Sequence, residues 1–141
     1  MKTFFRKHWF PLILLALTGG FFAHHLVMSH ITPLPQGFQP FETAAFERDL
    51  NAGRPLAVHI FAGWCITCRI QKDILETAAR DVPGIHYYVV DYDRQPAARE
   101  YLGQPAQSTL LLYKNGRLHS RMVPQPGEKG QLQVLLRNLK T

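Results

Sequence analysis

Apolar residues divide the chain into a continuous N-terminal hydrophobic run and a longer region of mixed periodicity. No Lys, Arg, Asp or Glu occurs from Trp9 through Phe41, and the first part of this stretch is almost entirely apolar. Because about 20 helical residues cross a bilayer, the run from Trp9 to Met28 is just long enough to span one. We therefore assign residues 1–30 to an N-terminal membrane anchor or signal segment.

The stretch from residue 31 to residue 40 interrupts this pattern with three prolines and a glycine. This composition is typical of an extended linker, because proline fixes φ and lacks an amide donor. We expect a Pro-rich tether over 31–40, followed by one domain over 41–141. The chain has 141 residues and is 46% hydrophobic, which suits a single domain with a substantial core.

Apolar positions in the domain follow helical and strand periods in alternation. Helices are expected at 43–50, 65–80, 96–102 and 128–139, and strands at 56–62, 85–91, 108–114 and 117–123. Thr43 is the expected cap of the first helix, and Asn115-Gly116 predicts a tight hairpin between the last two strands. The strand at 56–62 is apolar on both faces except at His59, as expected of a strand covered by helices on both sides. The pattern predicts a layered α/β fold.

The distribution of charge argues against a nucleic-acid-binding protein. The formal net charge is +6 at pH 7, but Lys2, Arg6 and Lys7 belong to the N-terminal segment. The other basic residues are interleaved with acidic ones, whereas a nucleic-acid surface needs a clustered basic face. The three early charges precede the apolar run, so the positive-inside rule keeps that end in the cytoplasm and exports the domain. A cleaved signal peptide is the alternative, although residues 22–30 offer no convincing cleavage site.

Cys65 and Cys68 are the only cysteines of the chain. They open the helix expected at 65–80, where sulfurs one turn apart can form or exchange a disulfide. The free N–H groups and partial positive charge of a helix N-terminus favour a thiolate. A thiolate beside a partner thiol is suited to disulfide exchange. We therefore expect a redox-active pair that requires no metal, flavin or nucleotide cofactor.

In these features the chain resembles the thioredoxin family over about residues 38–139. The matching segments are Trp64-Cys65-Ile66-Thr67-Cys68, Val90-Asp91-Tyr92-Asp93, the hairpin from Thr109 to Gly116, and Lys129-Gly130-Gln131-Leu132. The resemblance implies a thioredoxin-like fold with a central mixed sheet and helices on both faces, here preceded by one N-terminal transmembrane helix. The segment Phe61–Cys65 and the Ile-Thr dipeptide resemble the periplasmic C-terminal domain of the bacterial transmembrane thiol:disulfide reductase more than cytoplasmic thioredoxin.

The resemblance implies a thiol:disulfide oxidoreductase that reduces protein disulfides outside the cytoplasm. Cys65 matches the attacking nucleophile of the family, and Cys68 matches the cysteine that resolves the mixed disulfide. Trp64, Ser108 and Thr109 are expected to dock the substrate, and ordinary packing against the sheet is the alternative for Trp64. The expected partners are client proteins with disulfides and a membrane or periplasmic protein that supplies electrons. The expected location is the bacterial inner membrane with the domain facing the periplasm, or the soluble periplasm after cleavage.

Two positions depart from the family pattern. Ser108 stands where the family has a cis-proline, and a cis bond before a non-proline residue costs about 3–4 kcal/mol. The loop is therefore either trans and reshaped or held cis at that cost, and the serine hydroxyl offers the Cys65 thiolate a hydrogen bond. His59 stands where the family commonly has a buried Asp. Because histidine titrates near neutrality, His59 is a candidate for proton transfer at the resolving thiol, and a core histidine bonded to a backbone carbonyl is the alternative.

Other functions stay open on the residues alone. The same dithiol can oxidise or isomerise disulfides, because potentials of Cys-x-x-Cys pairs span a wide range. A groove reshaped by Ser108 can bind a partner protein without turnover. A zinc or copper site would need further ligands beside the two cysteines, for which His59, His86 and His119 are the candidates in the domain. A structural disulfide over so short a loop would restrict the unfolded chain little.

Overall fold

Strand β2 (Leu56–Phe61) lies in the middle of a five-stranded sheet, and all of its residues are buried. The computed structural model describes residues 2–31, 33–103 and 105–141. The strand order is β1-β3-β2-β4-β5, in which β1, β3 and β2 run parallel, β4 runs antiparallel to β2, and β5 runs antiparallel to β4. The sheet is therefore mixed, as the resemblance implies.

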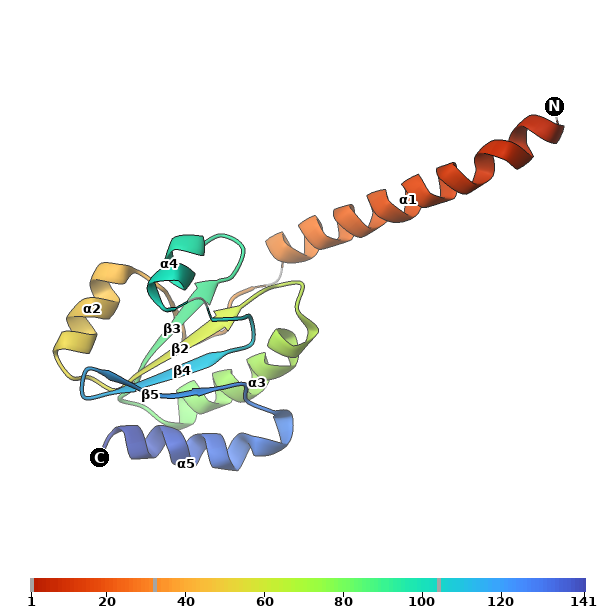
Figure 1. Ribbon diagram of the computed structural model, residues 1–141. Helices are drawn as coiled ribbons and strands as arrows, with labels where there is room; N and C mark the ends of the chain where they lie inside the picture. Colours follow the sequence, from red (N-terminus) through yellow and green to blue (C-terminus); the bar gives the residue numbers. More distant parts are fainter. Residues whose placement is uncertain (1, 32, 104) are drawn as a thin grey trace.

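The helices and strands follow the predicted order (Figure 1). After the N-terminal helix α1 (Lys2–Ile31), the remaining elements are β1 (Gln39–Pro40), α2 (Thr43–Asn51), α3 (Ile66–Asp81), β3 (His86–Asp91), α4 (Pro96–Tyr101), β4 (Leu110–Lys114), β5 (Arg117–Met122), the 3-10 turn η1 (Pro126–Glu128) and α5 (Lys129–Leu139). The hairpin turn is confirmed, since Asn115 and Gly116 both have positive φ, which a tight two-residue turn requires. The predicted α/β class is confirmed.

Two expectations about the start of the domain are wrong. Gln39–Pro40 pair with β3, so the sheet begins inside the segment that was assigned to the tether. Phe38, immediately before this strand, is buried in the core. Proline is compatible with an edge strand because its missing amide needs no partner there. Thr43 does not cap α2, because the N-cap residue is Glu42, whose side chain makes no capping hydrogen bond.

Different helix pairs cover the two faces of the sheet. Successive side chains of a strand point to opposite faces. Ala57 and Phe61 of β2 pack in one core cluster with α3 and α5, whereas Val58 and Ile60 pack in another with α2 and α4. This double coverage explains why β2 is apolar on both faces. His59 shares the face that α3 covers, and its ring hydrogen-bonds to a side chain of that helix.

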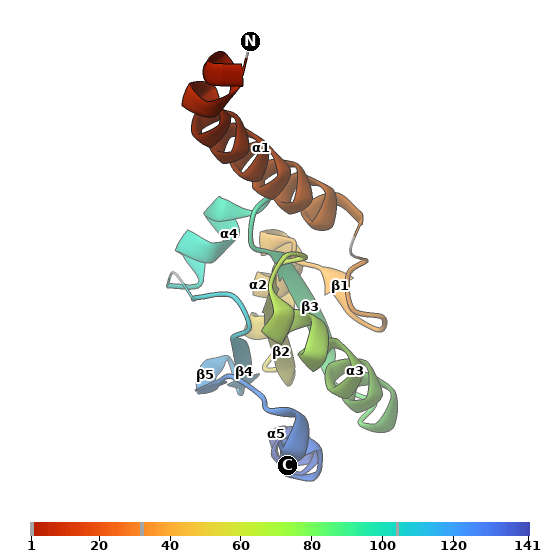
Figure 2. The same cartoon turned by 90° about the vertical axis from the view of Figure 1, so that its right-hand side faces the viewer.

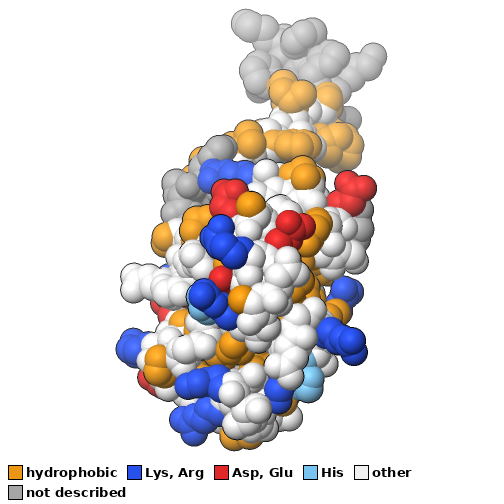
Figure 3. Space-filling model, turned by 90° about the vertical axis from the view of Figure 1, so that its left-hand side faces the viewer, with side chains coloured by type: hydrophobic (Ala, Val, Ile, Leu, Met, Phe, Trp, Pro, Cys, Tyr) orange, Lys and Arg blue, Asp and Glu red, His pale blue; other side chains and the backbone are white. Residues whose placement is uncertain are grey.

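Helix α1 extends away from the domain, and its C-terminal end lies close to the C-terminal ends of β2 and β3 (Figures 1 and 2). The segment Trp9–Val27 is long and apolar enough to cross a membrane, and none of it is buried by the rest of the protein. On the domain face shown in Figure 3, Lys and Arg side chains lie among acidic and uncharged ones, consistent with the interleaved charges of the sequence.

Candidate active site at the start of helix α3

The cysteine pair lies where β2 ends and α3 begins. Cys65 is the N-cap residue of α3, and its sulfur accepts a hydrogen bond from the Cys68 amide at 3.4 Å. The sulfur thus occupies the position of a capping oxygen, at the positive end of the helix dipole. Both cysteines are free thiols; Cys65 is 8% exposed and Cys68 is fully buried. Cys65 is therefore the member of the pair that a partner can reach.

The side chain of Ser108 contacts both sulfurs. Its Oγ lies 3.2 Å from Cys65 Sγ and 3.2 Å from Cys68 Sγ. A hydroxyl carries one proton, so it can donate to one sulfur while it accepts from the other. Ser108 therefore connects the two thiols through its hydroxyl group.

The backbone at Ser108 is reshaped relative to a cis-proline loop. The peptide bond before Ser108 is trans, and its φ is 68°. The Ser108 amide donates to the Ile60 carbonyl at 2.8 Å, and the Ile60 amide donates to the Thr109 carbonyl at 2.9 Å. These bonds extend the contact between β2 and β4 toward the cysteines. Of the two alternatives that the sequence left open, the structure has the trans one.

The two thiols differ in acidity although burial raises the pKa of each. At Cys65 the opposing hydrogen bonds, chiefly from the Ser108 hydroxyl and the Cys68 amide, outweigh burial, so the pKa lies below its ordinary value. At Cys68 burial dominates and raises the pKa to about 11. The thiolate therefore forms first on Cys65, and Cys68 keeps its proton at neutral pH.

His59 lies in the core on the same face of the sheet as α3. Its Nε2 lies 3.2 Å from Gln71 Oε1, and Gln71 Nε2 donates to the Pro124 carbonyl at 2.8 Å. Because the amide of Gln71 is oriented by Pro124, its oxygen faces the ring, and His59 Nε2 carries the proton. Burial lowers the pKa of His59 to about 4, so the expected titration near neutrality does not occur. Its partner is a side chain and not the backbone carbonyl that the sequence suggested.

Trp64 forms the rim beside Cys65. Its indole N–H donates to Asp93 Oδ2 at 2.9 Å, and its ring meets Tyr92 edge to face. The ring of His25, near the end of α1, stacks on Trp64 with centroids 5.4 Å apart. Trp64 is half-buried and held by these partners, so it is both a packed residue and part of the surface around the nucleophile.

The sequence model of the Thioredoxin family matches residues 37–138 of this chain. The chain belongs to the thioredoxin family. The thioredoxin of Chlamydia muridarum is 33% identical over 75 residues, which cover 53% of this chain and 74% of that protein. The thioredoxin of Pseudomonas aeruginosa is 30% identical over 82 residues, which cover 57% of this chain and 76% of that protein. This thioredoxin-family chain is therefore a thiol:disulfide oxidoreductase.

Solved structures of the family have the same fold. Trxlp from Edwardsiella tarda superposes with a TM-score of 0.60 at 30% identity, covering 69% of this chain and 95% of that one. Oxidised mitochondrial thioredoxin 3 from Saccharomyces cerevisiae gives a TM-score of 0.61 at 18% identity, covering 72% of this chain and 94% of that one, and supports the fold alone. The family match begins at residue 37, so α1 lies outside it.

The histidines considered as extra metal ligands are not gathered at the thioredoxin-family cysteines. His86 pairs in register with Leu56 at the start of β2, and its Nδ1 lies 2.7 Å from Asp49. His119 lies on β5. Within the part of the chain that the structure describes, no group of three or more His, Cys, Asp or Glu side chains is placed to hold a metal.

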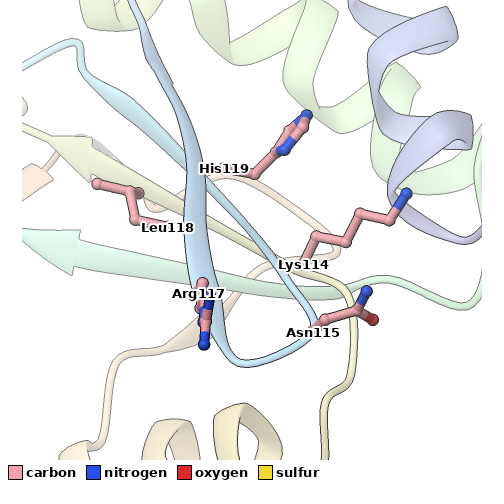
Figure 4. Close-up of a pocket in the computed structure, with 5 residues that line it drawn as sticks. All are labelled: Lys114, Asn115, Arg117, Leu118 and His119. Atoms are coloured by element: carbon pink, nitrogen blue, oxygen red, sulfur yellow. The ribbon is translucent and has the colours of Figure 1, made fainter.

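A surface hollow lies at the β4–β5 hairpin, at the other end of β2 from the cysteines (Figure 4). Its lining consists of Lys114, Asn115, Arg117, Leu118 and His119. Figure 4 shows the side chains of Lys114 and His119 on the same side of the hairpin. The hollow contains none of the residues of the cysteine site.

Three residues near the site were not assigned a role from the sequence. Gln71 is a fully buried polar residue on the inner face of α3, and that break in an apolar face was a usable signal. Asp93 belongs to a segment that matches the family pattern, and no local signal indicates that it accepts a hydrogen bond from the Trp64 indole. His25 follows the most apolar part of the N-terminal run, and no local pattern indicates its contact with Trp64.

Proposed function

We propose that this oxidoreductase reduces protein disulfides at the periplasmic face of a bacterial inner membrane, with α1 as a single-pass anchor. The apolar span Trp9–Val27 supports the anchor, because it is long and apolar enough to cross a bilayer and none of its residues is buried in the domain. Lys2, Arg6 and Lys7 precede the span and favour a cytoplasmic N-terminus. The similarity around Phe61–Cys65 to the periplasmic domain of the transmembrane thiol:disulfide reductase supports the same placement.

The observation that carries the redox assignment is the unequal acidity of the two thiols around Ser108. In the reduced pair with Cys65 deprotonated, Cys68 S–H donates to Ser108 Oγ, and the Ser108 hydroxyl donates to the Cys65 thiolate. These two hydrogen bonds account for both 3.2 Å contacts. Hydrogen bonds to a charged acceptor are stronger than those between neutral groups. The arrangement therefore supports Cys65 as the nucleophile and Cys68 as the resolving thiol.

The reaction proceeds by two exchange steps. The Cys65 thiolate attacks one sulfur of the client disulfide, a mixed disulfide forms, and the other client sulfur leaves as a thiolate that takes a proton from solvent. Cys68 then loses its proton and attacks Cys65 Sγ, which releases the second client sulfur as a thiol. The client gains two electrons and two protons, and the Cys65–Cys68 disulfide is left. A membrane or periplasmic protein with a dithiol restores the reduced pair by the reverse exchange.

The surrounding residues position the client and the helix. Trp64, Ser108 and Thr109 form the docking surface around Cys65. His59 acts as a neutral positioning residue. Its hydrogen bond to Gln71 connects β2 to α3 about one helical turn after Cys68. With a pKa of about 4, the His59 ring does not hold a proton at neutral pH, so we assign it no acid role.

A second candidate is the oxidation or isomerisation of disulfides with the same residues. The hydrogen bonds from Ser108 and the Cys68 amide to the Cys65 sulfur stabilise the dithiol form, and such stabilisation makes a pair more oxidising. The two directions differ in reduction potential, which for thioredoxin is about −270 mV and for strong periplasmic oxidants about −120 mV.

The deciding experiment equilibrates the full-length protein in detergent with glutathione buffers and measures the fraction of Cys65–Cys68 disulfide. Reduction of insulin disulfides by the same protein is measured in parallel. A potential near that of thioredoxin together with insulin turnover supports the reductase. A potential near −120 mV with slow reduction assigns the oxidase instead. A pair without a reversible potential contradicts both and leaves a binding module.

A further inference from the structure

The outer end of the membrane span touches the rim of the redox site. His25 lies two residues before the end of the span Trp9–Val27, about 3 Å along a helix axis. Its ring stacks on Trp64 with a centroid distance of 5.4 Å and an interplanar angle of 30°. Trp64 is adjacent to Cys65, so their Cα atoms are about 3.8 Å apart. These short steps place the nucleophile close to the end of the apolar helix.

The linker after α1 is attached to the domain and cannot act as a long tether. The backbone amide of Gln36 donates to Glu76 Oε1 on α3 at 2.7 Å. Leu34 packs against the core cluster that contains both cysteines, and Pro35 is buried. The linker is therefore held against the domain from residue 34 onward, within a few residues of the end of α1.

The surface next to Cys65 is apolar. Ile66 and Ile70 on the first turns of α3 are 66% and 50% exposed, and they line a shallow hollow together with Arg69 and Asp73. Tryptophan is enriched at the boundary between lipid and water, and Trp64 lies beside these exposed apolar side chains. The interfacial layer outside the hydrocarbon core is about 5–8 Å thick on each side. If α1 spans the bilayer, a thiol near the end of the span lies close to this layer.

From these contacts we infer that the anchor holds the Cys65 face at the membrane surface, and that the electron donor of this protein is an integral membrane protein with a dithiol at the bilayer surface. The inference rests on the proposed anchor role of α1. The donor thiolate attacks Cys65 Sγ of the Cys65–Cys68 disulfide, and its second thiol resolves the mixed disulfide. Two electrons and two protons pass to the cysteine pair, and the donor keeps a disulfide.

The position of the face is tested with single-tryptophan variants, since Trp9 and Trp64 are the only two tryptophans. Full-length Trp9→Phe is reconstituted in phosphatidylcholine vesicles that contain lipids spin-labelled near the headgroup. We expect these lipids to quench Trp64 fluorescence. A Gly-Ser insertion of about 20 residues ahead of Pro33, in the same variant, should abolish the quenching because it frees the domain from the span.

The companion variant Trp64→Phe distinguishes failure of the anchor from failure of the membrane-surface position. Quenching of Trp9 by lipids labelled deep in the acyl chain shows that α1 is inserted. If Trp9 is not quenched, the anchor is wrong and this inference is wrong with it. If Trp9 is quenched but Trp64 responds only to a water-soluble quencher, the inference fails while the proposed redox function stands.

The class of donor is tested with two model peptides in the same vesicles. Each is a transmembrane helix with a Cys-x-x-Cys dithiol, either at the bilayer surface or displaced from it by a rigid helical spacer of about 40 Å, which is roughly 27 residues. We expect the oxidised full-length protein to be reduced about tenfold faster by the surface dithiol, because the anchor raises its effective concentration there. The linker insertion should remove the difference. The assignment would be overturned if the two membrane peptides reduced the unmodified protein at equal rates. It would also be overturned if a soluble dithiol peptide reduced the protein and neither membrane peptide did.

Discussion

The Ser108 hydroxyl lies 3.2 Å from the Cys65 sulfur, although 43 positions separate the two residues in the chain. The contact exists because β4 pairs with β2, which brings the loop before β4 to the end of the strand that precedes Cys65. A residue at the usual cis-proline position of the family therefore acts here on the acidity of the nucleophile.

Loss of the Ser108 hydroxyl should make Cys65 less acidic. Ser108→Gly removes the hydroxyl and tolerates a φ of 68°. Without this hydrogen bond the pKa of Cys65 rises, and the thiolate fraction at pH 7 falls. One pKa unit corresponds to an about tenfold slower alkylation by iodoacetamide. Thr77→Ala, which removes a hydroxyl elsewhere on α3, should leave the rate unchanged. An unchanged rate in Ser108→Gly would show that the helix N-terminus alone sets the acidity.

Restoring the family residue with Ser108→Pro should destabilise the protein. The Ser108 amide donates to the Ile60 carbonyl, and proline has no such donor. Proline also requires φ near −65°, whereas the native value is 68°. We expect a loss of about 1–3 kcal/mol in the free energy of unfolding, measured with urea. If Ser108→Pro is as stable as the parent and more active, the loop has adopted another conformation without cost.

The two cysteines should respond differently to substitution by serine. Cys65→Ser removes the nucleophile, so reduction of insulin disulfides should fall to the level without protein. Cys68→Ser retains the nucleophile but cannot resolve the intermediate, so mixed disulfides with clients should accumulate and be visible on non-reducing gels. Normal turnover by Cys68→Ser would contradict the two-thiol mechanism.

Gln71→Leu should markedly lower the free energy of unfolding of the domain. It leaves the His59 Nε2–H and the Pro124 carbonyl without their partner in the core. Each buried unpaired polar group costs about 1–3 kcal/mol. Gln131→Leu at an exposed position of α5 is the matched control and should change the free energy of unfolding by no more than about 0.5 kcal/mol. Equal urea midpoints for the two variants would mean that another group satisfies His59.

Because of Asp49, the free energy of unfolding should depend on pH in the acid range. Burial raises its pKa, but a hydrogen bond from Tyr88 and the charges of His86 and Arg54 outweigh burial, so the pKa lies below its ordinary value of 3.8. A group with a lowered pKa contributes stability above its unfolded value and loses it as the pH falls through the folded value. The free energy of unfolding should therefore decrease below about pH 4.

Asp49→Asn tests this dependence. The variant should have a lower free energy of unfolding than the parent at pH 7, and this free energy should decrease less between pH 4 and pH 2. Urea unfolding at each pH measures both effects. Asp73→Asn on the exposed face of α3 is the control and should keep the parental profile. A parental profile in Asp49→Asn would assign the acid sensitivity to other carboxylates.

The order and type of the elements could be predicted because they depend on local periodicity. The buried run of β2, the apolar spacing of α3 and the Asn115-Gly116 turn each contain their own signal. The position of Cys65 at a helix N-terminus follows from the same local pattern, and so does its thiolate character. The short strand Gln39–Pro40 could not be predicted, because its formation depends on pairing with β3 and not on its own composition.

The α/β order, the apolar span at the N-terminus and the dithiol at a helix start could be predicted, since each arises from residues that are neighbours in the chain. The partners of these groups became known from the three-dimensional arrangement. The trans bond and positive φ of Ser108, the neutral state of His59 beside Gln71, and the stack of His25 on Trp64 all depend on segments far apart in sequence. Such contacts are set by strand pairing and by the burial of side chains between layers, which no local pattern encodes.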